Sequence, residues 1–294
     1  MSTRPEIHLR DLHSLDDCRA VVAIQEAVWG RDGETVPASL LLVSAKRGGI
    51  LMGAFAADDM VAFVWSLAGI RDSAPTQWSH MLGVLAAHRK SGVAERLKLA
   101  QRDRALSMGV EVIEWTFDPL QAANAHLNLH VLGAVGASYG VDVYGALAGP
   151  LHRGTPTDRL IVEWRIGEAH VDRRVRARGA DRKTAFTAVS ADVLDAPLAL
   201  RAEIDGEWIR CAGVEPALTY RRVLVPIPPR FSEMQQLQTD LALDWRLKIR
   251  EVVTAAFERG YRAVDFYLDR ETGGGLYLLA RAEDQEPVIP RTSD

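Results

Sequence analysis

The sequence lacks cysteine pairs and long apolar runs. Only Cys18 and Cys211 are present, far apart and without metal-ligand neighbours, so neither a disulfide scaffold nor a structural zinc site is expected. The N-terminal segment MSTRPEIHLRD has no apolar region typical of a signal peptide, and apolar segments such as FVWSLAGI are much shorter than a membrane span. These absences predict a protein of a reducing compartment, with the cytoplasm as the expected localisation and no membrane partner.

An excess of positive charge is lacking too. The chain has 35 Lys and Arg against 39 Asp and Glu, a formal net charge of -4, which argues against nonspecific binding to nucleic acid or to an anionic membrane. One segment, HVDRRVRARGADRK from His170 to Lys183, is rich in Arg. It is either an anion or nucleic-acid site or a solvated helix and linker between two domains. The lack of interleaved aromatic residues favours the second interpretation, so no nucleic-acid partner is expected.

The chain does contain a regular alternation of strand-like and helix-like segments. Its 294 residues are 48% hydrophobic and 25% charged, which is typical of a globular protein with one large or two modest domains. Residues 1-167 follow the order β, α, α, then three strands, then α, β, α, β, β. This order predicts an α/β domain built on a mixed sheet with helices on its faces. Residues 168-294 predict a smaller C-terminal α/β domain.

Two segments resemble each other. RLKLAQRDRALSMGVEVIEWTFD begins at Arg96, and RLKIREVVTAAFERGYRAVDFYLD begins at Arg246. Each predicts a helix, a Gly stop, a strand and a terminal Asp. Duplication of one unit explains the match, and so does the general pattern of α/β proteins, so the C-terminal domain is either a degenerate partial repeat or an unrelated unit. The second copy has VPIPPRFSEM in place of a glycine turn, and it is not expected to bind phosphate.

The segment with the clearest chemistry is a strand, HMLGVL, followed by the loop AAHRKSGVA and an amphipathic helix. Gly92 at the turn lets the backbone approach a ligand closely, and Ala94 keeps the first helical turn narrow. Backbone amides and the helix dipole favour a pyrophosphate at such a helix start. Arg89 and Lys90 add positive charge at the same place.

Arg89, Gly92 and Ala94 fit the pattern Arg or Gln, two residues, Gly, one residue, Gly or Ala. In this pattern and in its order of elements, the chain from residue 5 to about 166 resembles the GNAT superfamily of N-acyltransferases. DPLQAANAHLNLHVLGA and LHRGTPTDRLIVEW are similar to a group of predicted GNAT proteins with a C-terminal extension. The resemblance implies acetyl-CoA or another acyl-CoA as co-substrate, without a metal, in the splay between the GVL and EVIEWTF strands. The cofactor-binding residues that it implies are Leu82, Gly83, Val84, Arg89, Lys90, Ser91, Gly92, Val93, Ala94 and Asn124.

The implied reaction is attack of an amine on the thioester carbonyl, which requires a base and an acid. The resemblance places the base at His80, where a neutral imidazole can act near pH 7. The alternatives are a strand-end histidine without a catalytic role, or Glu114 as the base. The position of the family tyrosine, which would be the acid, is Leu129, which cannot donate a proton. The candidates for the acid are therefore Tyr139, Tyr144 and His130.

A polar loop is expected to recognise the substrate. LHRGTPTDRLIVEW contributes His152, Asp158 and Arg159, which suit an amine or a carboxylate, although Asp158 and Arg159 also fit a surface ion pair. Trp29 lies on the helix connection that shapes the acceptor pocket in the superfamily, and it is either a substrate contact or a core residue. His126 and His130 have the spacing of two metal ligands, but no third ligand is suggested and no metal is expected.

The sequence therefore predicts an N-acyltransferase that moves an acetyl or similar acyl group from acyl-CoA to a primary amine of a small metabolite or amino acid. A homodimer is one possible assembly of this chain. The alternative is a non-catalytic acyl-CoA-binding protein with a regulatory or interaction role.

Overall fold

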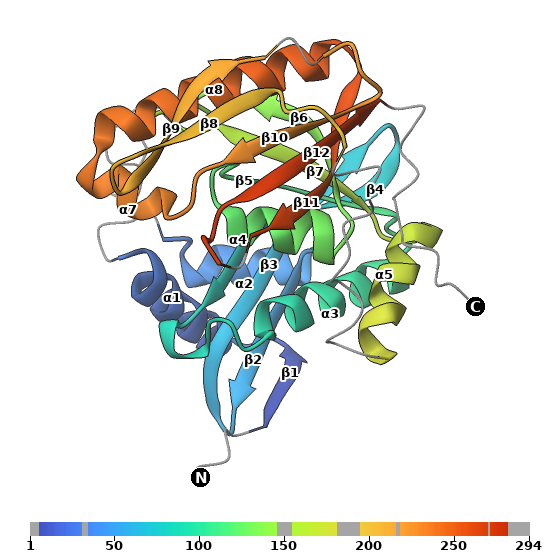
Figure 1. The fold of residues 1–294 in the computed structure, drawn as a ribbon. Helices are drawn as coiled ribbons and strands as arrows, with labels where there is room; N and C mark the ends of the chain where they lie inside the picture. The colour runs from blue at the N-terminus through green and yellow to red at the C-terminus, as the bar shows by residue number, and fades with distance from the viewer. Residues whose placement is uncertain are drawn as a thin grey trace. The chain divides into compact units, whose positions relative to one another are not determined.

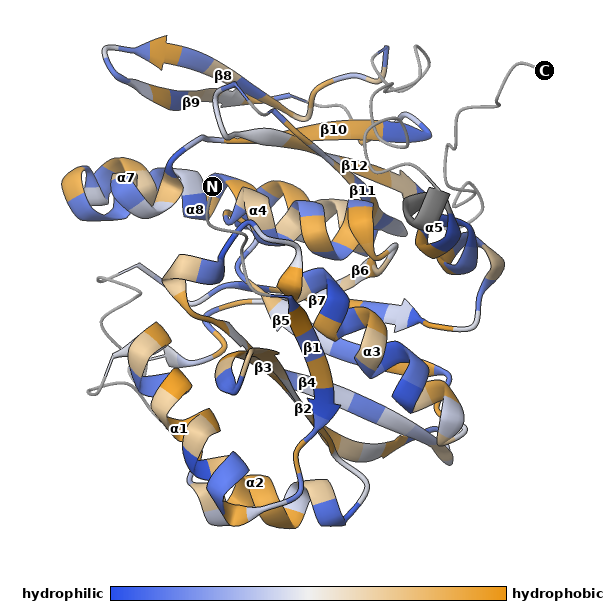
Figure 2. Cartoon of the chain, turned by 90° about the horizontal axis from the view of Figure 1, so that it is seen from below, coloured by the Kyte–Doolittle hydropathy of each residue, from blue (hydrophilic) through white to orange (hydrophobic). Residues whose placement is uncertain are grey.

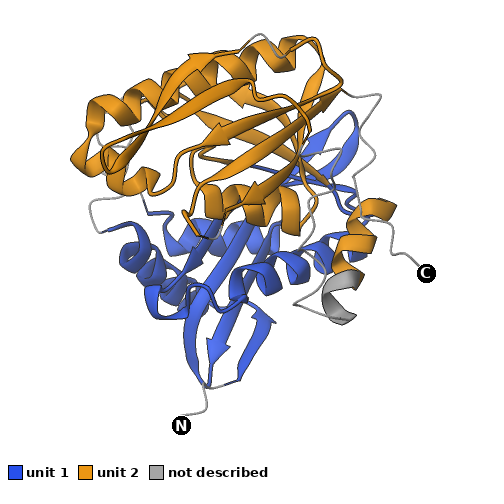
Figure 3. Ribbon diagram, in the orientation of Figure 1, with its two compact units in different colours: residues 1–115, 149–151, 165–167 blue, residues 116–148, 152–164, 168–294 orange. Residues whose placement is uncertain are grey.

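The structure is a computed structural model of the 294-residue chain, and it describes residues 6–30, 35–145, 155–180, 195–215, 218–269 and 271–281. The chain forms two compact units, coloured separately in Figure 3. Unit 1 comprises residues 1–115, 149–151 and 165–167, and unit 2 comprises residues 116–148, 152–164 and 168–294. Each unit contains segments that are far apart in the sequence, so the division differs from a single boundary at residue 167. The two predicted domains, 1-167 and 168-294, stay a prediction.

Unit 1 contains a mixed sheet. Its strands follow the order β1-β2-β3-β4-β5, antiparallel as far as β4, with β5 parallel to β4 (Figure 1). The predicted sequence of elements through residue 165 is confirmed, but β4 is longer than the predicted HMLGVL. Residues 74–79, before His80, extend it, because they pair with β3 and three of them also pair with β5. The strands are β1 Ile7–Asp11, β2 Ile50–Ala56, β3 Asp59–Arg71, β4 Ala74–Val84 and β5 Val112–Phe117.

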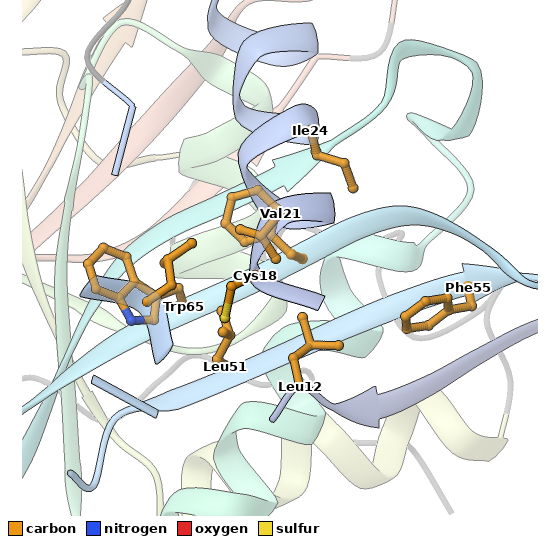
Figure 4. Close-up of a cluster of buried hydrophobic side chains, with 9 residues drawn as sticks. Leu12, Cys18, Val21, Ile24, Leu51, Phe55 and Trp65 are labelled. Carbon is orange, nitrogen blue, oxygen red and sulfur yellow. The ribbon is translucent and has the colours of Figure 1, made fainter. Parts of the chain in front are cut away.

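Helices cover both faces of this sheet. Helices α1 (Leu15–Trp29) and α2 (Ala38–Lys46) pack on one face, where a cluster of buried side chains forms the core shown in Figure 4. Helix α3 (Val93–Ser107) packs on the other face through Val93 and Leu97. Each fully buried aliphatic or aromatic side chain contributes about 1.5–3 kcal/mol relative to exposure. The α1 start carries a capping box, in which the Ser14 hydroxyl accepts from the Asp17 amide and the Asp17 carboxylate accepts from the Ser14 amide.

The strands of unit 2 follow the order β7-β6-β11-β12-β10, each antiparallel to its neighbour, and β8 and β9 form a two-stranded sheet. The strands are β6 Val135–Gly140, β7 Arg159–Arg165, β8 Leu200–Asp205, β9 Trp208–Val214, β10 Arg222–Ile227, β11 Tyr261–Leu268 and β12 Gly275–Arg281. The helices are α4 Ala122–Ala125, α5 Ala169–Ala180, α7 Phe231–Leu237 and α8 Thr239–Glu258. Apolar and polar bands alternate along α8 (Figure 2), which buries its apolar side. The Arg-rich segment is helical in α5, and its residues 181–183 lie outside the described residues.

The two similar segments share local structure but not strand pairing. Each is a helix followed by a glycine with positive φ and then a strand: α3, Gly109 (φ 73°) and β5 in one, α8, Gly260 (φ 84°) and β11 in the other. In unit 1, β5 pairs directly with β4. In unit 2, β12 pairs with β10 on one side and with β11 on the other, so it occupies the position between them. The strand before the second helix, β10, and the strand after it, β11, are therefore not directly paired as β4 and β5 are, because β12 lies between them.

No helix of the described part of the chain has the length and apolar character needed to cross a membrane.

Candidate functional site

Strands β4 and β5 form a short parallel pair and then part. Residues 76–78 of β4 pair with residues 112–114 of β5, and within the described residues no further pairing joins the two strands. The first residues beyond this pairing are Ser79 on β4 and Trp115 on β5, and the point where they part is named the strand fork. From Ser79 to Val84, β4 continues with β3 as its strand partner. Backbone groups on its other side are placed to pair with the amides of an extended ligand.

His80 is the extra residue of a β-bulge at this fork. Ser66 of β3 faces Ser79, while Trp65 faces Met81, so His80 has no opposite residue. A bulge of this kind places two successive side chains on the same face of the sheet. Met81 packs into the cluster under α1 and α2, and the His80 ring lies edge-on to Trp65 of the same cluster, with ring centroids 5.2 Å apart.

The surroundings of His80 suit a proton acceptor. Trp65 is itself fixed, because its indole Nε1 donates to Ser44 Oγ at 3.0 Å. His80 is an exposed residue, yet the contact of its ring with the sheet removes part of its water, and this partial burial lowers the pKa of His80. The neutral imidazole is therefore the main form at pH 7, and it is the form that accepts a proton. The role of His80 as the base stays a prediction.

The loop after β4 leads into the N-terminus of α3 through two residues with positive φ. Lys90 has φ 60° and Gly92 has φ 85°. Gly92 is the N-cap of α3 and offers no side chain to the first-turn amides. Alternating left-handed and right-handed residues form concave groups of backbone amides that bind anions. This arrangement can hold a pyrophosphate, as the sequence pattern predicts.

The side chains of the predicted cofactor residues divide into two sets. Arg89 and Lys90 are exposed, and Arg89 Nε donates to the Val84 carbonyl at 3.3 Å, which ties the loop to the end of β4. Ser91 Oγ donates to the His88 carbonyl at 2.6 Å. The remaining set points its side chains into the core and can offer only backbone groups: Leu82, Val84 and Val93 pack in the α3 cluster. Ala94 lies in the first turn of α3, where its amide belongs to the same predicted group.

Gly83 is explained by packing. A Cβ at this position would lie 2.6 Å from Cε1 of the Phe63 ring on β3, so the ring requires a glycine opposite it. Its predicted backbone contact with the cofactor stays a prediction.

A buried polar cluster at the fork was not found from the sequence. Lys98 of α3 is 2% exposed, and its Nζ donates to Gln101 Oε1 at 2.8 Å and to Ser79 Oγ at 3.0 Å. The same Nζ lies 3.7 Å from the centroid of the Trp115 ring. A lysine next to Leu97 in an amphipathic helix is expected to extend its ammonium group to solvent. The pattern of apolar residues along the helix therefore did not predict that Lys98 is buried.

Glu114 and Trp29 have structural partners in unit 1. The Glu114 carboxylate pairs with Arg71 Nη1 at 2.8 Å and accepts from Thr76 Oγ1 at 3.4 Å. Trp29 ends α1 and packs edge-on against Phe63 in the core cluster, with ring centroids 6.1 Å apart. This position agrees with the core interpretation of Trp29.

In unit 2, Tyr139 and Asp158 are joined to each other. Asp158 is fully buried and accepts from Tyr139 OH at 2.8 Å, from the Asp142 amide at 3.0 Å, and from Arg250 through two bonds of 2.7 and 2.9 Å. Burial and the neighbouring Asp158 carboxylate raise the pKa of Tyr139, which makes this phenol a weaker acid. Asp158 pairs with Arg250 rather than forming the surface pair with Arg159 that was one of the expectations.

The remaining predicted residues of unit 2 are Arg159, Tyr144, Asn124 and His152. Arg159 places its guanidinium 5.0 Å from the centroid of the exposed Tyr144 ring. Asn124 is exposed on α4, and His152 lies outside the described residues. The catalytic and substrate-binding roles of these residues stay predictions.

The histidine pair belongs to a π-helical segment, His126–Val131, where Leu129 is fully buried. His130 Nδ1 lies 2.9 Å from Asp265 Oδ1, and Asp265 also pairs with Arg174. Burial alone would raise the pKa of Asp265, but the bonds from His130 and Arg174 outweigh it and lower the pKa. The His126 ring stacks on His130 with centroids 4.9 Å apart. Among the described residues, no group of three or more His, Cys, Asp or Glu could hold a metal ion.

No protein-family model matches the chain, and no curated protein sequence matches it. Solved structures do match. The ribosomal-protein-S18-alanine N-acetyltransferase from Escherichia coli is 15% identical, with a TM-score of 0.43, over 56% of this chain and 96% of its own. The protein yncA from Salmonella typhimurium, solved with its cofactor acetyl-CoA, is 18% identical, with a TM-score of 0.44, over 55% of this chain and 95% of its own. A GCN5-related glucosamine N-acetyltransferase region in a fungal multi-domain β-N-acetylglucosaminidase is 18% identical, with a TM-score of 0.34, over 38% of this chain and 14% of that protein.

Proposed function

We propose that the chain is an acyl-CoA-dependent N-acyltransferase of the GNAT type. It moves an acetyl or similar acyl group to the primary amine of a small metabolite or amino acid. The observation that carries this proposal is the strand fork of unit 1. There, a parallel strand pair parts beside a bulge histidine, and the same strand leads into a glycine-capped helix N-terminus.

The fork and the loop suit the two ends of an acyl-CoA molecule. The amides around Gly92 and the charges of Arg89 and Lys90 favour its pyrophosphate. Between that loop and the fork, the segment from Ser79 to Val84 spans roughly 17 Å at about 3.3 Å per residue. The amide groups of a pantetheine chain can pair with β4 along this length, as a short added strand would.

The reacting end then lies beside His80. His80 accepts a proton from the ammonium form of the acceptor, which leaves a neutral amine. The amine nitrogen attacks the thioester carbonyl, a C–N bond forms, and the C–S bond breaks. His80 already holds a proton, so the positively charged nitrogen of the tetrahedral intermediate loses its proton to water. The thiolate of CoA takes a proton from an acid or from water, and His80 releases its own proton to solvent. The acceptor is a small amine, and neither nucleic acid nor a membrane is needed.

The first experiment tests the cofactor half. Arg89→Glu reverses the charge at the loop before α3, and Arg104→Glu makes the same change at an exposed position in the last turn of α3. Calorimetry with CoA should show weaker binding by about tenfold or more for Arg89→Glu, because a charge-assisted bond to phosphate contributes about 1.5–3 kcal/mol. Arg104→Glu should bind CoA as the unmodified protein does. Equal affinities for the two variants contradict the proposed site.

The second experiment tests turnover. Thiol release from acetyl-CoA is measured with a panel of primary amines, together with the pH dependence of kcat/KM. His80→Gln should lose the limb of this pH profile that reports the base, with kcat lower by about a hundredfold. An unaltered profile removes His80 from this role. CoA binding without thiol release across a broad panel supports the non-catalytic alternative, which the buried Leu129 and the hydrogen-bonded Tyr139 also favour.

A further inference from the structure

Lys98 connects three elements at the strand fork. It belongs to α3, its Nζ donates to Ser79 of β4, and it lies over the ring of Trp115 of β5. Ser79 and Trp115 are the first residues of their strands beyond the hydrogen-bonded pairing. The lysine therefore links the two strands by side-chain contacts at the position where their backbone bonds end.

The burial of this lysine is unfavourable for stability. Lys98 is 2% exposed, and burial lowers the pKa of Lys98 well below its usual value. Gln101, which accepts from Lys98, is fully buried, and its Nε2 has no hydrogen-bond partner among the described residues. A buried amine and an unsatisfied amide each cost free energy relative to apolar side chains of similar size. Groups retained in spite of such a cost concentrate at functional sites, where activity is favoured over stability.

The position of the cluster indicates what it does. Ser79 directly precedes His80, so a displacement of Ser79 is transmitted to the bulge through one peptide unit. The Lys98 ammonium group contacts the face of the Trp115 ring on β5. At 2% exposure Lys98 is covered by these neighbours and acts through them.

We propose that Lys98 is a positioning residue for acyl transfer: its contacts with Ser79 and Trp115 set the separation of β4 and β5 at the fork, and with it the position of His80. The acyl-transfer part of this inference rests on the proposed function. The role of Lys98 in the separation of β4 and β5 does not rest on the proposed function, because this separation can be tested without measuring turnover.

Lys98→Met tests the inference, since methionine has a similar length without the amine. Lys46→Met, at an exposed position at the end of α2, is the matched control. We expect Lys98→Met to fold with equal or higher thermal stability, to bind CoA within about threefold of the unmodified protein, and to lose about tenfold to a hundredfold in kcat, because small misplacements of reacting groups have effects of this size. A purely structural lysine predicts the reverse, a less stable protein whose active fraction keeps its kcat and pH profile.

The pH dependence of stability gives a second readout with a defined sign. Because the folded-state pKa of Lys98 is lowered, the folded protein binds fewer protons than the unfolded protein between that pKa and the unfolded value of about 10.4. Stability therefore gains from Lys98 as pH rises through this window, and this gain should be missing in Lys98→Met. Lys46→Met should retain it.

Hydrogen exchange separates a failure of this inference from a failure of the proposed function. In Lys98→Met, amides of residues 76–84 and 112–115 should exchange faster, whereas those of β2 should not change. Ser79→Ala should loosen the same amides, because it removes the bond from Lys98 Nζ together with the bond that Ser79 Oγ donates to Gln101 Oε1 at 3.2 Å. The effect of the double variant should be smaller than the sum of the two single effects, because the bond between Lys98 and Ser79 is lost in both. Unchanged exchange at the fork overturns the inference whatever the turnover. Absence of turnover in the unmodified protein overturns the proposed function, and the exchange result still decides whether Lys98 sets the fork.

Discussion

Replacing Gly92 by alanine, with Gly109→Ala as its control, separates the cost of backbone geometry from the loss of cofactor binding. Both glycines flank α3 and both have positive φ, 85° for Gly92 and 73° for Gly109. A residue with a Cβ in this conformation costs about 1–2 kcal/mol. A Cβ at Gly109 would meet no atom within 4 Å, so its cost is that of the backbone alone. Both variants should therefore lose about 1 kcal/mol of unfolding free energy.

The effects on CoA binding should differ. If Gly92→Ala relaxes out of the left-handed region, the amides at the α3 N-terminus turn away from the pyrophosphate. The loss of one charge-assisted hydrogen bond, about 1.5–3 kcal/mol, raises Kd by about ten- to a hundredfold. Gly109→Ala, at the other end of the helix, should leave Kd unchanged.

Calorimetry with CoA and thermal unfolding with and without CoA measure both quantities. At a CoA concentration of 100 times Kd, ligand binding stabilises the folded protein by about 2.7 kcal/mol. The unmodified protein and Gly109→Ala should show this gain, and Gly92→Ala should show about 0.4–1.4 kcal/mol at the same concentration. Equal Kd values for the two alanine variants would refute the placement of the pyrophosphate at this helix start.

Two further predictions concern unit 2. Asp118→Asn should lower the unfolding free energy by about 3 kcal/mol, because it leaves the fully buried Arg246 without the carboxylate that it bonds at 2.6 and 2.8 Å. Burial raises the pKa of Asp118, but Arg246 outweighs it and lowers the pKa, so this contribution is present above the unfolded value of about 3.9 and is lost as pH falls through the folded pKa. Urea unfolding at several pH values checks this, and a loss below 1 kcal/mol at pH 7 contradicts it. Tyr139→Phe should lose about 1 kcal/mol of stability with its bond to Asp158, and keep kcat within about twofold in the thiol-release assay. A large fall in kcat would restore Tyr139 as the acid.

Local features of the fold could be predicted because they depend on neighbours in the sequence. The capping box at Ser14, the glycine after each of the two similar helices, and the turn at Gly92 each require a residue type at a fixed spacing. Alternating apolar and polar residues then predict the order of strands and helices.

The site itself depends on distant pairing, which the same patterns do not contain. The bulge at His80 is defined by the register against β3, and the run HMLGVL looks like a regular strand. Asp158 bonds Arg250, which is 92 residues away, whereas the local sequence suggests only substrate recognition or an ion pair with the neighbouring Arg159. The burial of Lys98 depends on the place where β4 and β5 part, and the position of β12 between β10 and β11 depends on two separate pairings.

The bulge also makes His80 a removable residue. On β3, Trp65 and Ser66 are adjacent, and they face Met81 and Ser79. Deletion of His80 would join these partners into a regular ladder and leave every pair on both sides in its present register. A deletion elsewhere in β4 would instead turn all later side chains to the opposite face. A single codon can therefore be lost or gained at this point without disturbing the register of the sheet, so the residue at the fork can change while the remainder of β4, up to the loop before α3, keeps its pairing with β3.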